Sequence, residues 1–237
     1  MSNKSKHKAT PQWAEPGHKS KAQQQQRERK LWIVFGVVAV LLVIGAAVIA
    51  LAAGGDDDKQ VDPTGKIQQN RTVDVVSGSP LAKFDSPQND TEIGKTAPVV
   101  SGSSFDGSFV RLAPQDGKFL MVVFVAHWCP HCQIEVPRLV DWYNSGVVPS
   151  TLDVVGVSTA TDQARGNWTP SEWLEKEGWP WKVLADDKNS TAGANFGLAT
   201  FPYFVIISPD GQVVARDSGE KTVAQLEAIV DAAMKVN

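Results

Sequence analysis

The feature that most constrains this chain is a pair of cysteines between an apolar run and a helix-like pattern. Cys129 and Cys132 are the only two cysteines among 237 residues. They follow Phe119–Ala126 (FLMVVFVA), a run typical of a strand that is buried on both faces. Pro130 comes directly after the first cysteine, and proline is favoured at the first position of a helix. The sequence therefore predicts a dithiol at a strand-to-helix junction.

Two cysteines at this spacing suit thiol–disulfide exchange better than structural cross-linking. A disulfide across so small a loop adds little stability, whereas the positive end of a helix dipole favours the reactive thiolate. Cys129 is the expected nucleophile, and Cys132 is placed to resolve a mixed disulfide. His131 lies between them, and an imidazolium there would stabilise the thiolate and with it the reduced form. These neighbours favour an oxidising dithiol.

The first 92 residues fall into three segments of different composition. Residues 1–30 are rich in Lys and Gln without an apolar period, which predicts a disordered basic tail. Residues 31–53 carry no charged side chain, and as a helix they would span about 35 Å, enough to cross a hydrocarbon core of about 30 Å. Residues 54–92 are rich in Gly, Asp, Ser and Pro, which predicts a flexible linker.

The charges around the apolar run predict its orientation in a membrane. Basic residues crowd its N-terminal side, and Asp56, Asp57 and Asp58 follow its C-terminal side. The positive-inside rule then places the tail in the cytoplasm and the chain after residue 54 outside. A cleaved signal peptide is the alternative, but the run exceeds the usual core of about 7–15 residues. We expect a single-pass anchor in the cell membrane, an extracytoplasmic C-terminal domain, and no nucleic acid as a partner of the tail.

From residue 93 onward, strand and helix patterns alternate. Thr169-Pro170-Ser171-Glu172 and Thr222 with Gln225 are typical helix starts, and Pro209-Asp210-Gly211 predicts a hairpin turn. Strands are expected at 109–112, 119–126, 152–158, 181–185, 203–208 and 212–216, and helices at 129–144, 169–178, 191–196 and from 222. This order predicts an α/β domain over residues 93–237, with a central mixed sheet flanked by helices.

The motif resembles a known active site. Trp128-Cys129-Pro130-His131-Cys132 is similar to that of the thioredoxin superfamily, and its Cys-Pro-His-Cys part resembles DsbA-type thiol oxidases. Gly94-Lys95-Thr96-Ala97-Pro98 and the Cys132-x-x-Glu135-x-Pro137 pattern are closer to membrane-anchored TlpA-type thioredoxins. The match covers roughly residues 93–235. It implies a thioredoxin fold and thiol-disulfide oxidoreductase activity, for which no cofactor is expected.

The resemblance also implies roles for single residues. Pro202 matches the cis-proline whose loop faces the dithiol and helps to bind the substrate peptide, so Trp128, Phe201 and Pro202 are the expected substrate-binding residues. Glu135 matches an acidic residue that tunes proton transfer in the membrane-anchored reductases; a solvated helix carboxylate is the alternative. The buried acid that many thioredoxins carry six residues before the first cysteine is here Val123.

Several tryptophans and one more histidine allow two interpretations each. His127 either contacts the active site or lies at the surface. Four tryptophans follow the third of the expected strands, and either line a substrate surface or pack beneath a long connection. These are Trp168, Trp173, Trp179 and Trp181.

The expected function is disulfide donation to cysteine-containing exported proteins, together with a membrane redox partner. The close alternative is the reverse reaction, a TlpA-type disulfide reductase serving apocytochrome c or another client. A copper metallochaperone is an alternative of another class, because soft thiolates suit Cu(I). It usually needs a wider cysteine spacing and a distant histidine, and no histidine follows His131. No metal site is expected, because zinc requires four ligands as a rule.

Overall fold

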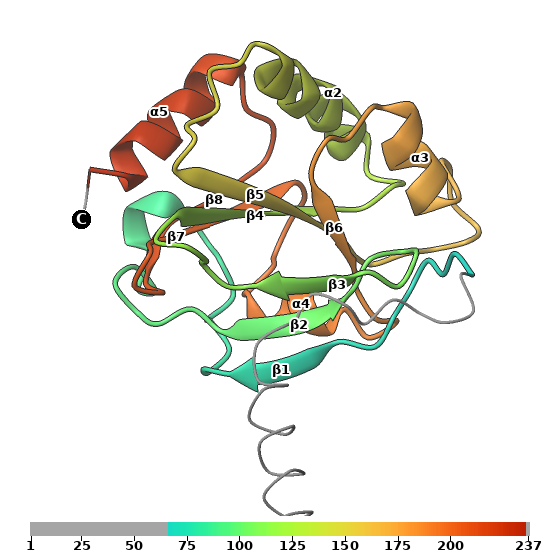
Figure 1. The fold of residues 1–237 in the computed structure, drawn as a ribbon, viewed down its shortest axis with the longest axis horizontal. Helices are drawn as coiled ribbons and strands as arrows, with labels where there is room; N and C mark the ends of the chain where they lie inside the picture. Colours follow the sequence, from blue (N-terminus) through green and yellow to red (C-terminus); the bar gives the residue numbers. More distant parts are fainter. Residues whose placement is uncertain (1–65, 236–237) are drawn as a thin grey trace, which may run out of the picture. The chain divides into compact units, whose positions relative to one another are not determined.

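A five-stranded mixed sheet forms the centre of the part of the chain that the computed structural model describes, residues 66–235 (Figure 1). Counted from one edge of the sheet to the other, the first three strands are parallel to one another, and each of the last two is antiparallel to the strand before it. In spatial order the strands are β6 (Lys182–Ala185), β5 (Leu152–Ser158), β4 (Phe119–Val125), β7 (Tyr203–Ile207) and β8 (Val213–Ser218). This is the predicted thioredoxin-like arrangement of a mixed sheet.

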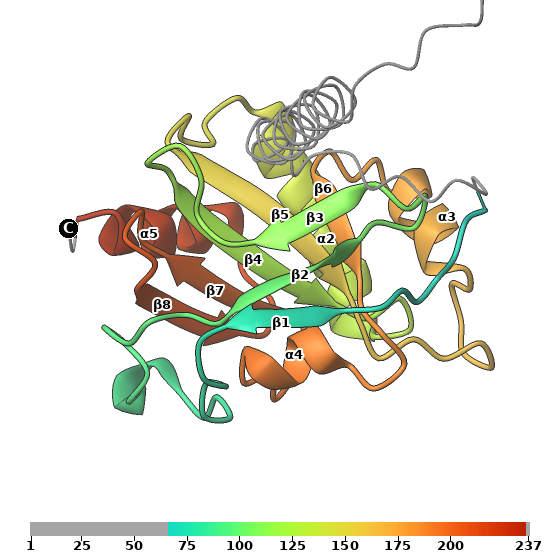
Figure 2. The same ribbon diagram turned by 60° about the horizontal axis from the view of Figure 1, so that its bottom comes forward.

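Helices cover one face of the sheet, and a smaller sheet covers much of the other (Figures 1 and 2). The first face carries α2 (Pro130–Asn144), α3 (Pro170–Lys176) and α5 (Val223–Ala233). The second face carries α4 (Thr191–Asn195) and the three-stranded sheet of β1 (Asp74–Ser77), β2 (Val99–Ser103) and β3 (Phe109–Leu112). A short 3-10 helix, η1 (Pro87–Asn89), precedes β2.

The central sheet has a hydrophobic core on each face: the first core lies under α2, α3 and α5, and the second lies under the small sheet and α4. Strand β4 contributes to both cores because its side chains alternate between the two faces. Met121, Val123 and Val125 pack with α2, α3 and α5. Leu120 and Phe124 pack with the small sheet and α4. Every residue of β4 is buried, and complete burial of each such side chain contributes about 1.5–3 kcal/mol. Burial on both faces is why β4 reads as an uninterrupted apolar run.

The helix starts also form as predicted. Thr169 caps α3 by accepting the Glu172 amide. At α5, the Thr222 hydroxyl accepts the Gln225 amide at 3.3 Å, and the Gln225 side chain accepts the Thr222 amide at 2.8 Å. Strand β2 was not predicted, because its sequence VVSGS has no long apolar alternation. It forms because both neighbouring strands pair with it.

The predicted flexible linker does not extend to residue 92. Strand β1 pairs with β2, and Leu81 and Phe84 are buried in the second core. The amides of these two residues donate to carbonyls of α4 and its C-terminal turn, Asn195 and Gly197, at 2.9 and 2.8 Å. The few apolar residues of this segment are widely spaced in a polar sequence, which is why composition suggested a linker.

The predicted tail and membrane anchor, residues 1–30 and 31–53, lie outside the described residues, as do residues 54–65 of the predicted linker. Within residues 66–235, no helix combines the length and apolar character that crossing a membrane requires.

A buried ion pair fixes the segment that contains Leu81 and Phe84 to the central sheet. The Arg216 guanidinium on β8 donates to both carboxylate oxygens of Asp90. It also donates to the Ala82 carbonyl at 2.8 Å and to the Tyr203 hydroxyl at 3.3 Å. Both charged side chains are almost fully buried, at 2% and 1% exposed. A charge in that environment requires its partner.

Replacing Asp90 tests whether this segment is part of the folded domain. Asp90→Asn leaves the Arg216 charge buried without a counter-charge, so we expect the free energy of unfolding in urea to fall by about 3–5 kcal/mol. The exposed Asp85, five residues earlier, provides the control. Asp85→Asn should change the free energy by no more than about 0.5 kcal/mol. Equal stability of the two variants would show that the segment contributes little to the fold.

Candidate active site

The dithiol lies at the junction between the end of β4 and the beginning of α2. Cys129 is the N-cap of α2 in an extended conformation, and Pro130 occupies the first helical position. The Cys129 amide donates to the Ala126 carbonyl at 3.0 Å, which closes the turn between strand and helix. The predicted strand-to-helix junction is therefore confirmed, and the two free cysteines lie in the first turn of the helix, where backbone amides lack partners within the helix.

The two thiols differ in their access to solvent. Cys129 is 6% exposed, whereas Cys132 is completely buried. Burial, together with the neighbouring Cys129, raises the pKa of the Cys132 thiol well above its usual range. Only Cys129 can meet a protein substrate, and Cys132 needs a proton acceptor before it can attack as a thiolate. This division matches the predicted roles of nucleophile and resolving residue.

Glu135 is placed to accept that proton. It lies three residues after Cys132, hence on the same face of α2, and it is completely buried. One carboxylate oxygen accepts the Lys221 amide at 2.8 Å; the other is buried without a hydrogen-bond partner among the described residues. Burial raises the pKa of Glu135 to about 7, against the opposing effect of the Lys221 hydrogen bond. The alternative of a solvated helix carboxylate is therefore wrong.

An acidic residue that the sequence did not single out connects the outer and inner parts of the site. The exposed His131 ring donates through Nδ1 to the Glu220 carboxylate at 2.8 Å. Arg138 donates to the other Glu220 oxygen at 3.1 Å and lies 3.7 Å from Glu135. The hydrogen bond from His131 is the main cause that lowers the pKa of Glu220. The Glu220 carboxylate therefore joins His131 and Arg138 in one hydrogen-bonded group.

The expected substrate-binding residues gather beside Cys129. The Phe201–Pro202 peptide bond is cis, as the resemblance implied. The Phe201 ring meets the Trp128 ring edge to face, with 6.0 Å between centroids. Because Trp128 precedes Cys129 and Phe201 precedes Pro202, this contact brings the proline loop to the dithiol. The structure thus assembles Trp128, Phe201, Pro202 and the two cysteines at one end of the sheet.

The remaining candidates are His127 and the four tryptophans, and most of them contribute to packing. His127 is completely buried, so the interpretation as a surface histidine is wrong. Of the four tryptophans, Trp173 is buried, and Trp179 and Trp181 pack against each other and the first core. These three therefore favour packing over a substrate surface. Trp168 is 37% exposed and meets the His127 ring edge.

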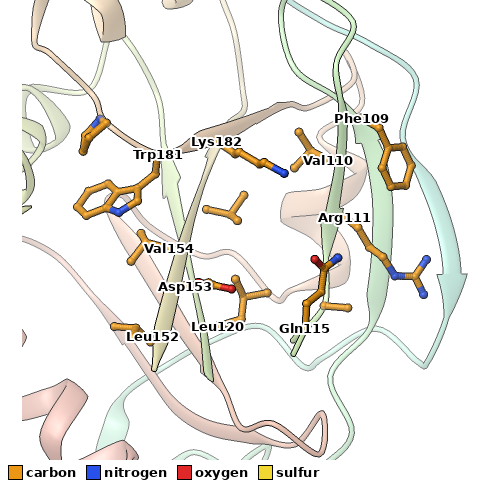
Figure 3. A pocket seen from close by; sticks show the side chains of 13 residues that line it. Phe109, Val110, Arg111, Gln115, Leu120, Leu152, Asp153, Val154, Trp181 and Lys182 are labelled. Atoms are coloured by element: carbon orange, nitrogen blue, oxygen red, sulfur yellow. The ribbon is translucent and has the colours of Figure 1, made fainter. Parts of the chain in front are cut away.

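A cavity of about 390 Å³ lies at the opposite end of the central sheet (Figure 3). Its lining includes Leu120, Leu152 and Lys182, which stand at the beginnings of the parallel strands, whereas Cys129 follows the end of β4. Arg111 on β3 also lines it, with the guanidinium turned outward (Figure 3). The cavity is therefore separate from the dithiol. Among residues 66–235, no three His, Cys, Asp or Glu side chains are grouped to hold a metal ion.

Comparison with known proteins agrees with this geometry. The sequence profile described as the AhpC/TSA family matches residues 93–216, which include the dithiol and the proline loop. The chain belongs to the AhpC/TSA family. This member of the AhpC/TSA family is a thiol-disulfide oxidoreductase of the thioredoxin superfamily, as its relatives indicate.

Two of those relatives are bacterial proteins named for the same chemistry. The thiol:disulfide interchange protein HelX of Rhodobacter capsulatus is 29% identical over 133 residues, covering 54% of this chain and 69% of HelX. The thiol-disulfide oxidoreductase ResA of Bacillus cereus is 30% identical over 148 residues, covering 61% and 80%. A solved thioredoxin domain of a Bacteroides vulgatus thiol-disulfide oxidoreductase is 26% identical, with a TM-score of 0.48, over 61% of this chain and 98% of that chain.

Glu135 should make the stability of this AhpC/TSA-family protein depend on pH. The carboxyl group binds its proton more tightly when folded, with a pKa of about 7 against 4.5 for the unfolded chain. The favourable contribution is complete below about pH 4.5 and is lost as the pH rises through about 7. The free energy of unfolding should therefore fall by about 3 kcal/mol across this range because of Glu135.

Urea unfolding at several pH values between 4.5 and 8 measures this dependence. Glu135→Gln should remove that part of the fall, while Glu175→Gln, at an exposed position on α3, should retain it. A Glu135→Gln variant with the pH dependence of the unmodified protein would contradict the assignment.

Proposed function

We propose that this protein is a membrane-anchored, extracytoplasmic enzyme that donates disulfides to cysteine-containing exported proteins. The observation that carries the proposal is the pair of cysteines at the start of α2: Cys129 is slightly exposed, Cys132 is completely buried, and the His131–Glu220 pair lies in the same turn. The apolar segment 31–53 supports the membrane anchor, and the basic residues before it support the outside location.

The reaction follows from the placement of the two sulfurs. A client thiolate attacks Cys129 in the Cys129–Cys132 disulfide, and Cys132 leaves as a thiolate that takes a proton, for which Glu135 is the adjacent source. A second client thiolate then attacks the mixed disulfide, and Cys129 leaves as a thiolate. The client loses two electrons as its disulfide forms, and the enzyme gains them. A membrane redox partner reoxidises the dithiol.

The surroundings of Cys129 favour this direction. Its thiolate is the leaving group of the second step, so any feature that stabilises the thiolate makes the disulfide more oxidising. The first turn of α2 supplies unpaired amides and the positive end of the dipole. The His131 ring donates to Glu220 in the same turn, and a positively charged ring there would stabilise the thiolate further.

The second candidate is the reverse reaction, a TlpA-type disulfide reductase. The buried Glu135 favours it, because by resemblance this position matches the acid of the membrane-anchored reductases. Both candidates use the same residues, so the reduction potential separates them.

The reduction potential of the purified protein, measured against glutathione, tests the direction. We expect a value near the roughly −120 mV of DsbA rather than the roughly −270 mV of thioredoxin. His131→Gln removes the imidazole whose positive form would stabilise the Cys129 thiolate. It should shift the equilibrium at least about tenfold toward the disulfide, lowering the potential by roughly 30 mV. Lys182→Gln, at the distant cavity, should leave it unchanged. A potential at or below that of thioredoxin would assign the reductase role.

Replacing the resolving cysteine tests the substrate class. Cys132→Ala keeps the Cys129 thiolate but lacks the sulfur that would displace a bound client. Mixed disulfides formed when Cys129 attacks a client disulfide should therefore accumulate and disappear on reduction. Cys129→Ala should trap none. Expressed in a bacterial cell, the first variant should capture exported proteins that contain cysteine. Capture confined to cytoplasmic proteins would contradict the proposed location.

A further inference from the structure

A loop that follows β5 folds back over the beginning of the active-site motif. It comprises residues 159–169, and the sequence offers no motif for it. The Thr159 amide donates to the Val125 carbonyl at 3.1 Å, which continues the pairing of the two parallel strands. The loop therefore leaves the sheet at the same end as the dithiol.

The buried His127 fixes this loop in place. Its Nδ1 lies 2.7 Å from the Gly166 carbonyl, and the Asp162 amide donates to Nε2 at 3.2 Å. A carbonyl only accepts and an amide only donates, so one neutral tautomer, with the proton on Nδ1, satisfies both contacts. Burial lowers the pKa of His127, in agreement with the neutral ring. The Asn167 side chain adds a bond to the His127 carbonyl at 3.2 Å.

The same loop also holds the side chain that precedes the nucleophile. The Trp128 indole donates to the Ala160 carbonyl at 2.7 Å. The Arg165 guanidinium lies over the indole, with its central carbon 3.6 Å from the ring centroid. This is a short cation–π contact. Arg165 is thus fixed against Trp128, the residue before Cys129, although 36 residues separate Arg165 from Cys129 in sequence.

The charge of Arg165 is not neutralised within the described part of the chain. No carboxylate of residues 66–235 forms an ion pair with it. The nearest acidic residue in sequence, Asp162, uses its Oδ1 to accept the Ala164 amide. A guanidinium stacked on an aromatic ring keeps its N–H edges available, and these suit a carboxylate.

We propose that Arg165 is a specificity-determining residue, which favours polypeptides with an acidic side chain next to the reacting cysteine. The inference rests on the proposed exchange function, because it assigns a preference to the same site. A client cysteine bonded to Cys129 brings its neighbours toward Trp128, the preceding residue, over which the guanidinium lies. Attraction at such an exposed position increases the rate of productive encounter and is weakened by salt.

Peptide kinetics with the full-length protein in detergent micelles test this. The oxidised protein is mixed with excess reduced peptides whose single cysteine is flanked on both sides by Glu, Gln or Lys. Each rate is divided by the rate of the same peptide with the uncharged 2-hydroxyethyl disulfide, which corrects for the reactivity of the peptide thiol. We expect the Glu peptide to react about five-fold faster than the Lys peptide at low ionic strength.

Two variants and one control isolate the role of Arg165. Arg165→Gln should bring the Glu/Lys ratio close to one, and Arg165→Glu should invert it. Arg111→Glu, at the opposite end of the sheet, should leave it unchanged. Oxidation of dithiothreitol, an uncharged dithiol, is measured for all four proteins to show that each site still exchanges. The Glu/Lys ratio compares two peptides on the same protein, so it is independent of any change in that basal rate.

The outcomes separate this inference from the proposed function. Equal rates for the Glu and Lys peptides, or an unchanged ratio in Arg165→Gln, would overturn the role of Arg165 while exchange with dithiothreitol persisted. Failure of the unmodified protein to exchange with dithiothreitol or any peptide would overturn the proposed function itself.

Discussion

The complete burial of β4 is the constraint on which the rest of the structure depends. Its side chains fill two cores at once, so the strand cannot slide by one residue without exchanging every side chain between them. The chain that leaves β4 is therefore delivered to one fixed place. That place is the N-cap of α2, where Cys129 meets the unpaired amides of the helix.

From this point, polar contacts spread the chemistry over segments distant in sequence. Glu220 accepts from His131 and Arg138 and so joins the exposed and buried halves of the site. His127 accepts and donates on the other side and holds the loop that carries Arg165. The nucleophile thus stands between two fixed sets of charges. One set acts on the thiolate itself, and the other acts on what approaches it.

Local pattern was sufficient for much of the fold and for the cysteines. Apolar runs and caps predicted most strands and helices within about two residues, whereas the cis-proline was expected only from the family resemblance. The missing parts depend on tertiary contacts. Strand β2 forms because it pairs with β1 and β3. Residues 66–92 are mostly polar, and the few side chains among them that are buried in the second core are widely spaced. Glu220 and Arg165 belong to no motif, because their roles arise from neighbours contributed by distant segments.

Because Cys132 is completely buried, Cys129 is the one sulfur of the dithiol that a substrate can contact. A reagent, an oxidant or a client protein can reach the dithiol only through Cys129, since its partner sulfur presents no surface. Two molecules therefore cannot be bound covalently at the same time. A mixed disulfide at Cys129 is released by Cys132, by a second thiol of the same client, or by another thiol that reaches the exposed sulfur. The protein therefore exchanges disulfides with one substrate molecule at a time.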